Sequence, residues 1–284
     1  MEKAYKYRIY PNKSQKIQIA KTFGCCRFVY NYYLAKRIEL YEKNKETFSY
    51  VQCANDMKKL KSQLQWLKEV DSTALQSALR DLDMAYKKFF KEHTGYPKFR
   101  SKKTYRFSYK SKQVNGNVQY CGKYIKLPKL GMIKTKNKLV PQGRILNATV
   151  SQEPSGKYYI SLCCTDVDIK PLKRTGNSVG LDLGIKEFCI TSDGKMIENP
   201  KYLKKSLAKL VKLQRKLSRK PKGSSNRNKA RIKIARQHEK IANQRKDFLQ
   251  KLSTELIKEN DIICIEDLQI CLLYTSDAAD DTPC

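Results

Sequence analysis

The spacing of apolar residues changes twice along this chain, and the changes divide it into regions that must fold differently. Residues 12–92 carry apolar side chains at helical spacing, most clearly from Leu75 to Phe89. Residues 104–167 instead hold short apolar runs separated by turn signals such as Asn115-Gly116. From Val179 onward, strand patterns flank a long helical stretch. At 284 residues the length allows about two domains, so a multidomain α+β chain is predicted.

The first region begins with a strand and continues as helices. Residues 3–9 alternate Tyr and Lys, which predicts a short strand. Residues 12–44 then predict a helix with a break near Gly24, while Ser49 and Asp71 are in position to cap two further helices. The first strand can join the later strands, which would make the helical block an insertion.

The later regions predict two hairpins and a helical pair. Residues 145–152 and 157–165 flank a turn and predict one hairpin, and Asp193-Gly194 marks another. Residues 170–177 are a plausible linker. Helix is predicted from Pro200 to about Glu259, interrupted at residues 220–225, and a last strand covers residues 261–268.

The charge balance defines the class of partner. The chain has 59 Lys and Arg against 27 Asp and Glu, a net charge of +32. Solubility alone needs a net charge of only about 2–8, so the excess predicts a polyanionic partner. The sequence has neither the ~20 apolar residues of a membrane span nor a signal peptide at its start. Its ten Cys form no C-x-x-C pair, which favours reduced thiols in a cytoplasmic protein.

Two acids lie in strand patterns where a lone carboxylate would be costly to bury. Asp182 stands between Leu181 and Leu183, and Glu266 follows the apolar run 262–265. Two acids on two core strands suggest a shared cation, and oxygen ligands suit Mg²⁺ or Mn²⁺. Metal ions held this way can clamp a phosphodiester. The alternatives are a helix cap, a surface acid, or the phosphate-binding hairpin of actin-like ATPases, against which the basic excess argues.

A basic helical pair separates these two strands. Residues 201–246 hold 18 Lys or Arg and one acid, Glu239. Apolar residues interleave with these Lys and Arg residues, which predicts an amphipathic hairpin with one core face and one basic face. The predicted core face carries Leu207, Leu210, Leu213, Leu217, Ile232, Ile234 and Ile241. The opposite face would track phosphates without reading sequence. Its predicted nucleic-acid contacts are Lys204, Lys205, Lys212, Arg215, Arg219, Arg227, Arg231 and Arg236.

Several short motifs, in this order and spacing, resemble one family. They are R-I-Y-P at 8–11, R-F-V-Y-N at 27–31, L-P-K-L-G at 127–131, G-L-D-L-G-I-K at 180–186, N-P-K-Y at 199–202 and I-E-D-L at 265–268. Over residues 3–270 the chain resembles TnpB (also called OrfB), the transposase-like protein of insertion sequences and relative of type V CRISPR nucleases. Older descriptions of that family call its helical block a helix-turn-helix.

The resemblance implies a domain plan. Residues 1–10 with 101–170 would form a split β-barrel wedge domain, and residues 11–100 an inserted helical recognition domain. Residues 177–270 would form an incomplete RuvC nuclease domain of RNase H-like α/β fold. Residues 271–284 contain three Asp and no Lys or Arg, and this abrupt change of composition suggests a foreign tail on a truncated chain.

The resemblance also implies an activity. A guide RNA from the transposon end would direct cleavage of target DNA beside a short adjacent motif, with Asp182 and Glu266 as catalytic acids that hold Mg²⁺ or Mn²⁺. The family's third acid and its zinc-binding Cys pairs have no counterpart here, so structural Zn²⁺ belongs to the missing C-terminal part. We therefore expect a parent endonuclease in the prokaryotic cytoplasm at the nucleoid, and we expect the 284-residue chain to bind nucleic acid without cutting it. The alternative is a nuclease-dead RNA- and DNA-binding regulator.

Two residues of the helical block are candidates for reading the adjacent motif. Gln76 can make a bidentate contact to adenine, worth ~1–3 kcal/mol of discrimination. Tyr50 can stack on a base or wedge beside it. Both can equally be ordinary surface or core residues.

Overall fold

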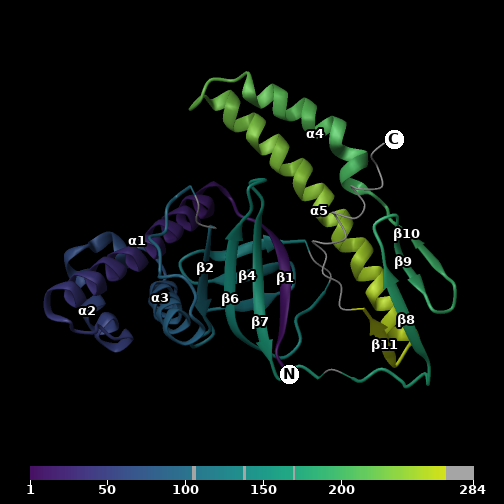
Figure 1. The fold of residues 1–284 in the computed structure, drawn as a ribbon. Coiled ribbons are helices and arrows are strands. Elements are labelled where there is room, and N and C mark those ends of the chain that lie inside the picture. Colours follow the sequence, from purple (N-terminus) through teal and green to yellow (C-terminus); the bar gives the residue numbers. More distant parts are fainter. Residues whose placement is uncertain (104–106, 137–138, 169, 267–284) are drawn as a thin grey trace. The chain divides into compact units, whose positions relative to one another are not determined.

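The computed structural model describes residues 1–103, 107–136, 139–168 and 170–266 (Figure 1). The chain divides into two compact units, Met1–Ile169 and Lys170–Cys284, and each is described by itself. Among the described residues, no helix is both long enough and apolar enough to span a bilayer. The predicted foreign tail and the end of the I-E-D-L motif lie outside the described residues.

The first unit contains a seven-stranded sheet and three α-helices. In chain order its elements are β1 (Lys3–Tyr10), α1 (Lys13–Asn44), α2 (Tyr50–Gln63), a 3₁₀ turn (Gln65–Lys68), α3 (Ser72–Glu92), β2 (Ser108–Lys112), β3 (Gln119–Cys121), β4 (Tyr124–Leu127), β5 (Gly131–Thr135), β6 (Arg144–Gln152) and β7 (Tyr158–Thr165).

The sheet is antiparallel throughout and has the strand order β2-β6-β7-β1-β5-β4-β3. The first strand pairs with β7, with Tyr5 opposite Leu162, and with β5, with Ile9 opposite Thr135. This confirms that the first strand joins the later ones and that the helices are an insertion in sequence. The predicted β6–β7 hairpin is also confirmed. In the described pairing β2 and β3 end the sheet, and the split barrel stays a prediction.

The helices begin at the predicted caps. Ser49 and Gln52 form a capping box at the start of α2, and Asp71 accepts a hydrogen bond from the Thr73 backbone N–H at the start of α3. The predicted break near Gly24 is wrong, because α1 runs without interruption. A helical Gly costs about 1 kcal/mol, which is small beside the burial of Phe23, Cys25 and Cys26 around it.

A buried carboxylate joins α3 to the sheet. Asp71, 6% exposed, accepts hydrogen bonds from the Thr73 hydroxyl at 2.7 Å and from the buried Ser111 hydroxyl of β2. Residues 75, 78, 79 and 82 of α3 are buried, as their spacing predicts, and belong to one core that continues into the sheet. Helix α3 and strand β2 are therefore fixed to each other by both polar and apolar contacts.

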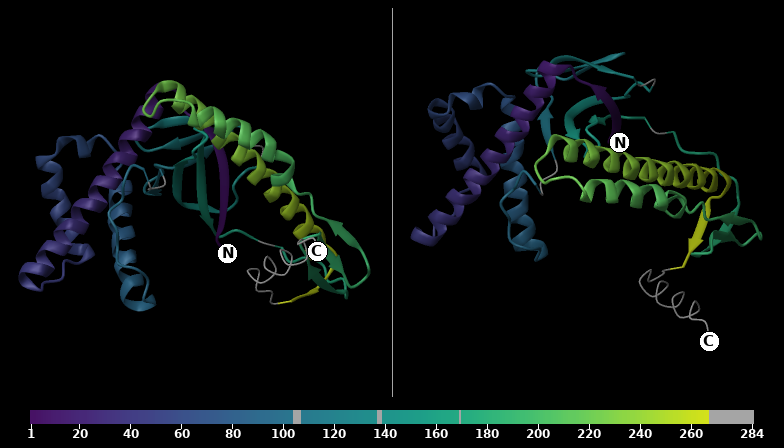
Figure 2. Two further views of the ribbon diagram at one scale, coloured as in Figure 1. Left: turned by 45° about the horizontal axis from the view of Figure 1, so that its top comes forward. Right: turned by 90° about the horizontal axis from the view of Figure 1, so that it is seen from above.

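The second unit is a small sheet with a long helical hairpin. Its elements are β8 (Ser178–Leu183), β9 (Glu187–Thr191), β10 (Met196–Glu198), α4 (Tyr202–Ser218), α5 (Ser225–Glu259) and β11 (Ile262–Ile265). The strand order is β10-β9-β8-β11, and only the β8–β11 pair is parallel among the described strands. Helices α4 and α5 lie side by side and connect β10 to β11 (Figures 1 and 2). The predicted Asp193-Gly194 turn and helical pair are confirmed.

Candidate functional site

The parallel pair β8 and β11 brings the two predicted acids to one place. Cys264 pairs with Gly180 and Ile265 with Leu181, so the next step in this register sets Glu266 level with Asp182. Adjacent residues at one level of a parallel sheet project their side chains to the same face. Both acids line an open hollow of about 460 Å³, together with residues 180, 181, 190–192, 264 and 265. The two carboxylates therefore belong to one site.

The prediction that these acids are buried is wrong. Val179 and Leu181 of β8 are 3% and 8% exposed, and Asp182 lies on the opposite, exposed face. Glu266 follows β11 and is also exposed. Desolvation therefore gives no reason for a cation. A cation is instead favoured by the placement of the two carboxylates on neighbouring strands, because like charges there repel unless a positive charge lies between them.

A buried thiol near the two acids lies outside the hollow. Cys189 of β9 is 1% exposed. Burial, followed by the negative charge of Asp182, raises the pKa of the Cys189 thiol above its ordinary value. Cys189 pairs with Leu183, one position from the Asp182–Ile190 pair, so its side chain lies on the opposite face of the sheet from Asp182 and does not line the hollow. Among the described residues, no group of three or more His, Cys, Asp or Glu could hold a metal ion.

The register of β8 and β11 depends on a carboxylate that the sequence did not single out. Asp261 accepts hydrogen bonds from the backbone N–H groups of Gly176, at 2.8 Å, and Thr175, at 3.0 and 3.1 Å. These bonds hold the pKa of Asp261 below its ordinary value, Gly176 contributing most. The Asp261 N–H donates to the Asn177 carbonyl at 2.9 Å. Asp261 thus ties the chain before β8 to the start of β11, one strand length from Glu266.

The helical hairpin between these strands presents Lys and Arg side chains to solvent. Seven predicted contacts are exposed, namely Lys204, Lys205, Lys212, Arg215, Arg219, Arg231 and Arg236. The eighth, Arg227, is half-buried and donates to the carbonyls of Leu217 at 3.1 Å and Lys220 at 2.7 Å. Its guanidinium thus closes the turn at the end of α4, which is a structural role.

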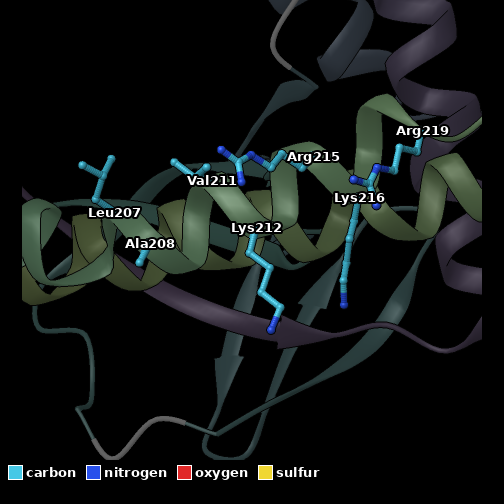
Figure 3. Close-up of a pocket in the computed structure, with 7 residues that line it drawn as sticks. All are labelled: Leu207, Ala208, Val211, Lys212, Arg215, Lys216 and Arg219. Atoms are coloured by element: carbon cyan, nitrogen blue, oxygen red, sulfur yellow. The ribbon is translucent and has the colours of Figure 1, made fainter.

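One face of α4 is basic at one end and apolar at the other. Residues 207, 208, 211, 212, 215, 216 and 219 line a hollow of about 690 Å³ (Figure 3). Lys212 and Lys216 extend to one side of this face, and Arg215 and Val211 to the other. Leu207, predicted to face the core, is 52% exposed, while Leu210 and Ile241 are buried. The buried interface between α4 and α5 therefore includes fewer residues than the predicted core face.

Arg80, which the sequence analysis did not single out, links Tyr50 of α2 to α3, the helix that carries Gln76. The Arg80 guanidinium lies 5.4 Å from the Tyr50 ring centroid, and Arg80 Nε donates to the Tyr50 hydroxyl at 3.3 Å. Gln76 is exposed one helical turn before Arg80 on α3. Tyr50, Gln76 and Arg80 thus form a polar surface on the first unit. The only sequence signal was the i, i+4 spacing of Gln76 and Arg80.

Two family models match different parts of the chain. A family model for OrfB, described as a probable transposase, matches residues 161–276, and one described as a helix-turn-helix domain matches residues 1–46. In the structure residues 1–46 form β1 and the single helix α1. The class of the chain is thus a transposase-like protein.

Two relatives carry the provisional name of RNA-guided DNA endonuclease. One, from Streptomyces pristinaespiralis, is 38% identical over 95% of this chain and 68% of its own length. The other, InsQ of Escherichia coli (strain K12), is 35% identical over 97% of this chain and 68% of its own length. The chain belongs to the OrfB/TnpB family. Its fold resembles the protein in the Cas12f1-sgRNA-target DNA complex, with a TM-score of 0.55 and 11% identity over 95% of this chain and 81% of that one.

Proposed function

We propose that this chain carries the guide-binding part and two catalytic acids of an RNA-guided DNA endonuclease that serves a transposon. The observation that carries the proposal is the shared level of Asp182 and Glu266 on the parallel strands β8 and β11. The basic hairpin lies between these strands in the sequence, so one unit combines a phosphate-binding surface with paired carboxylates. The relatives' names and the 38% identity support the same activity.

The donor set fits a hard divalent cation. Carboxylate oxygens are the ligands that Mg²⁺ and Mn²⁺ prefer, and Asp182 and Glu266 supply them from an open hollow that solvent and substrate can enter. Such an ion, when bound, supplies charge stabilisation to a phosphodiester and lowers the pKa of water. The residues themselves hold two negative charges at fixed spacing. The nearby Cys189 contributes no ligand, and structural Zn²⁺ belongs to sequence beyond the described residues.

The proposed partners are a guide RNA from the transposon end and a target DNA with an adjacent motif. Base pairing reads the target sequence, and the protein holds the backbone. The exposed Lys and Arg side chains of α4 and α5 would contact phosphates, and Tyr50 with Gln76 would contact the adjacent motif. The proposed place of action is the prokaryotic cytoplasm at the nucleoid.

A second candidate is a protein that holds RNA and DNA without cutting. One observation favours it for the 284-residue chain: the described residues supply two carboxylates at the hollow and no group of three metal-binding side chains. Two-metal cleavage uses bridging and flanking ligands around ions ~3.5–4 Å apart, which two carboxylates alone leave incomplete. On this account the 284-residue chain binds nucleic acid and does not cleave it.

Sequencing of the RNA that copurifies with the chain tests the guide proposal. The chain is expressed beside its own flanking DNA, and its bound RNA is compared with total cellular RNA. We expect one discrete RNA from the transposon end to be strongly enriched. Bound RNA that merely follows cellular abundance would contradict a guide function and leave only non-specific polyanion binding.

A further inference from the structure

A second hollow in the Lys170–Cys284 unit has no role in the function proposed so far. It encloses about 880 Å³ between the β8–β9 loop, the start of α4 and the middle of α5. Asn199 holds two of these walls together. Its side-chain N–H donates to the Ile185 carbonyl at 3.0 Å, and its side-chain oxygen accepts from the Lys201 N–H at 3.1 Å. The hollow is thus a built feature of the fold.

Aromatic rings form one side of this hollow. The Phe248 ring centroid lies 5.1 Å from that of Phe188, at an interplanar angle of 86°, and 6.5 Å from that of Tyr202, at 73°. All three rings line the hollow and all are only partly buried. An edge-on cluster of partly exposed rings offers ring faces to a planar ligand. Nucleobases stack on such rings, whichever base it is, because every base has a π-face.

Basic side chains line the same hollow. The exposed side chains of Lys186, Lys201, Lys204 and Arg245 line the hollow, and no Asp or Glu belongs to its described lining. Four positive charges around an apolar cavity are poorly matched to a neutral apolar ligand or a protein side chain. They match a ligand that combines a flat ring with an anionic group.

We propose that this hollow holds one unpaired nucleotide of a single-stranded nucleic acid, its base against Phe248 and its phosphate beside Lys201, Lys204 and Arg245. The inference rests on the proposed nucleic-acid function and deepens it. The lining begins at Ile185, in the loop that follows β8, the strand that carries Asp182. A single-stranded nucleic acid anchored in the hollow is therefore held by the loop that continues β8, and β8 carries a proposed catalytic acid.

Photocrosslinking of a short oligonucleotide locates the nucleotide directly. The full chain is mixed with a five-nucleotide single strand that carries 5-iodouracil at its centre, irradiated, and mapped by mass spectrometry. We expect crosslinks at Phe248 or Tyr202. In parallel, Phe248→Leu keeps an apolar side chain but removes the ring, and Arg245→Gln removes one charge from an exposed position.

The affinity changes separate this site from general phosphate binding. Phe248→Leu is expected to weaken binding of the single strand about 5- to 150-fold, the equivalent of ~1–3 kcal/mol per stacked base, and to leave duplex binding unchanged. Arg245→Gln should weaken the single strand with no loss of folding. Phe90→Leu, at an exposed ring of the other unit, is the matched control and should change neither.

The outcomes distinguish this inference from the proposed function. Wild-type binding with crosslinks only outside the hollow, or pocket variants that bind as tightly as wild type, would overturn the nucleotide site and leave the nuclease proposal standing. A Phe248→Leu chain could lose thermal stability while the Arg245→Gln chain binds the single strand normally. That result would show that the Phe248 ring serves packing within the protein, and it would also overturn the nucleotide site. A wild-type chain that binds no nucleic acid would overturn both.

Discussion

Neutralising the basic face of α4 should weaken nucleic-acid binding in a way that depends on salt. The perturbation replaces Lys212, Arg215, Lys216 and Arg219 with Gln. All four side chains are exposed and line one face of the helix (Figure 3). Gln has nearly the helix propensity of Lys and Arg, so α4 should remain intact.

The magnitude follows from counterion release. Each phosphate contact contributes about 0.9 to the slope of log affinity against log salt on duplex DNA. Four lost contacts therefore flatten the slope by up to ~3.6. With ~6–10 phosphate contacts, the affinity of the wild type should fall by a factor of ~10³–10⁵ between ~50 and ~200 mM salt. The factor by which the affinity of the variant falls should be about a hundredfold smaller.

A matched control removes the same net charge from lysines that already have acidic partners. Lys21, Lys43, Lys87 and Lys251 lie within 3.1 Å of the carboxylates of Glu69, Glu39, Asp83 and Asp247. Replacing these four with Gln should leave the slope close to that of the wild type. Filter binding across the salt series measures all three proteins. Equal slopes for the two quadruple variants would refute the assignment of the α4 face, and a flat wild-type response would refute the polyanion argument.

Three further predictions address the scaffold and the motif-reading surface. Asp71→Ala should lower the free energy of unfolding of the first unit by about 1–3 kcal/mol, since it removes a helix cap and leaves the buried Ser111 hydroxyl without its acceptor; urea denaturation followed by the fluorescence of Trp66, the only Trp, measures this. Asp261→Asn should destabilise the second unit near neutral pH. Because folding lowers the pKa of Asp261, its stabilisation is present above the ordinary Asp pKa of ~3.9 and is lost as pH falls through the lower folded value. In urea denaturation followed by circular dichroism, wild type and variant should therefore begin to converge as the pH falls below about 4; a constant difference would contradict the linkage. Gln76→Ala should relax the adjacent-motif preference in a randomised-flank library, and an unchanged preference removes Gln76 from the site.

Local signals predicted the elements whose determinants lie close together in sequence. The caps at Ser49 and Asp71, the β6–β7 hairpin and the Asp193-Gly194 turn each depend on residues a few positions apart. The prediction of a break at Gly24 failed because the helix propensity of one residue is small beside the burial of its neighbours Phe23, Cys25 and Cys26.

The surroundings of the candidate site were harder to predict. Asp182 stands between two leucines, and strand alternation alone puts it on the face opposite the buried Leu181; the expectation of burial assumed a strand covered on both faces. Arg80 and Asp261 were missed because their partners lie 30 and 85–86 residues away, at distances that only the fold closes. The strand patterns predicted that Asp182 and Glu266 share a cation, and the resemblance to TnpB implied that both are catalytic, but the parallel register that sets them level is seen only in the fold.

The central claim is that Asp182 and Glu266 are catalytic acids of an RNA-guided DNA endonuclease. Its most direct test is guided cleavage by a fusion in which residues 1–270 replace the matching stretch of the Streptomyces relative. With matched guide RNA and Mg²⁺ this fusion should cut target DNA. Asp182→Asn should bind the same DNA without cutting it, while Asp193→Asn, an exposed acid in the β9–β10 turn, should cut normally. Cleavage by the Asp182→Asn fusion at the rate of its parent would contradict the account.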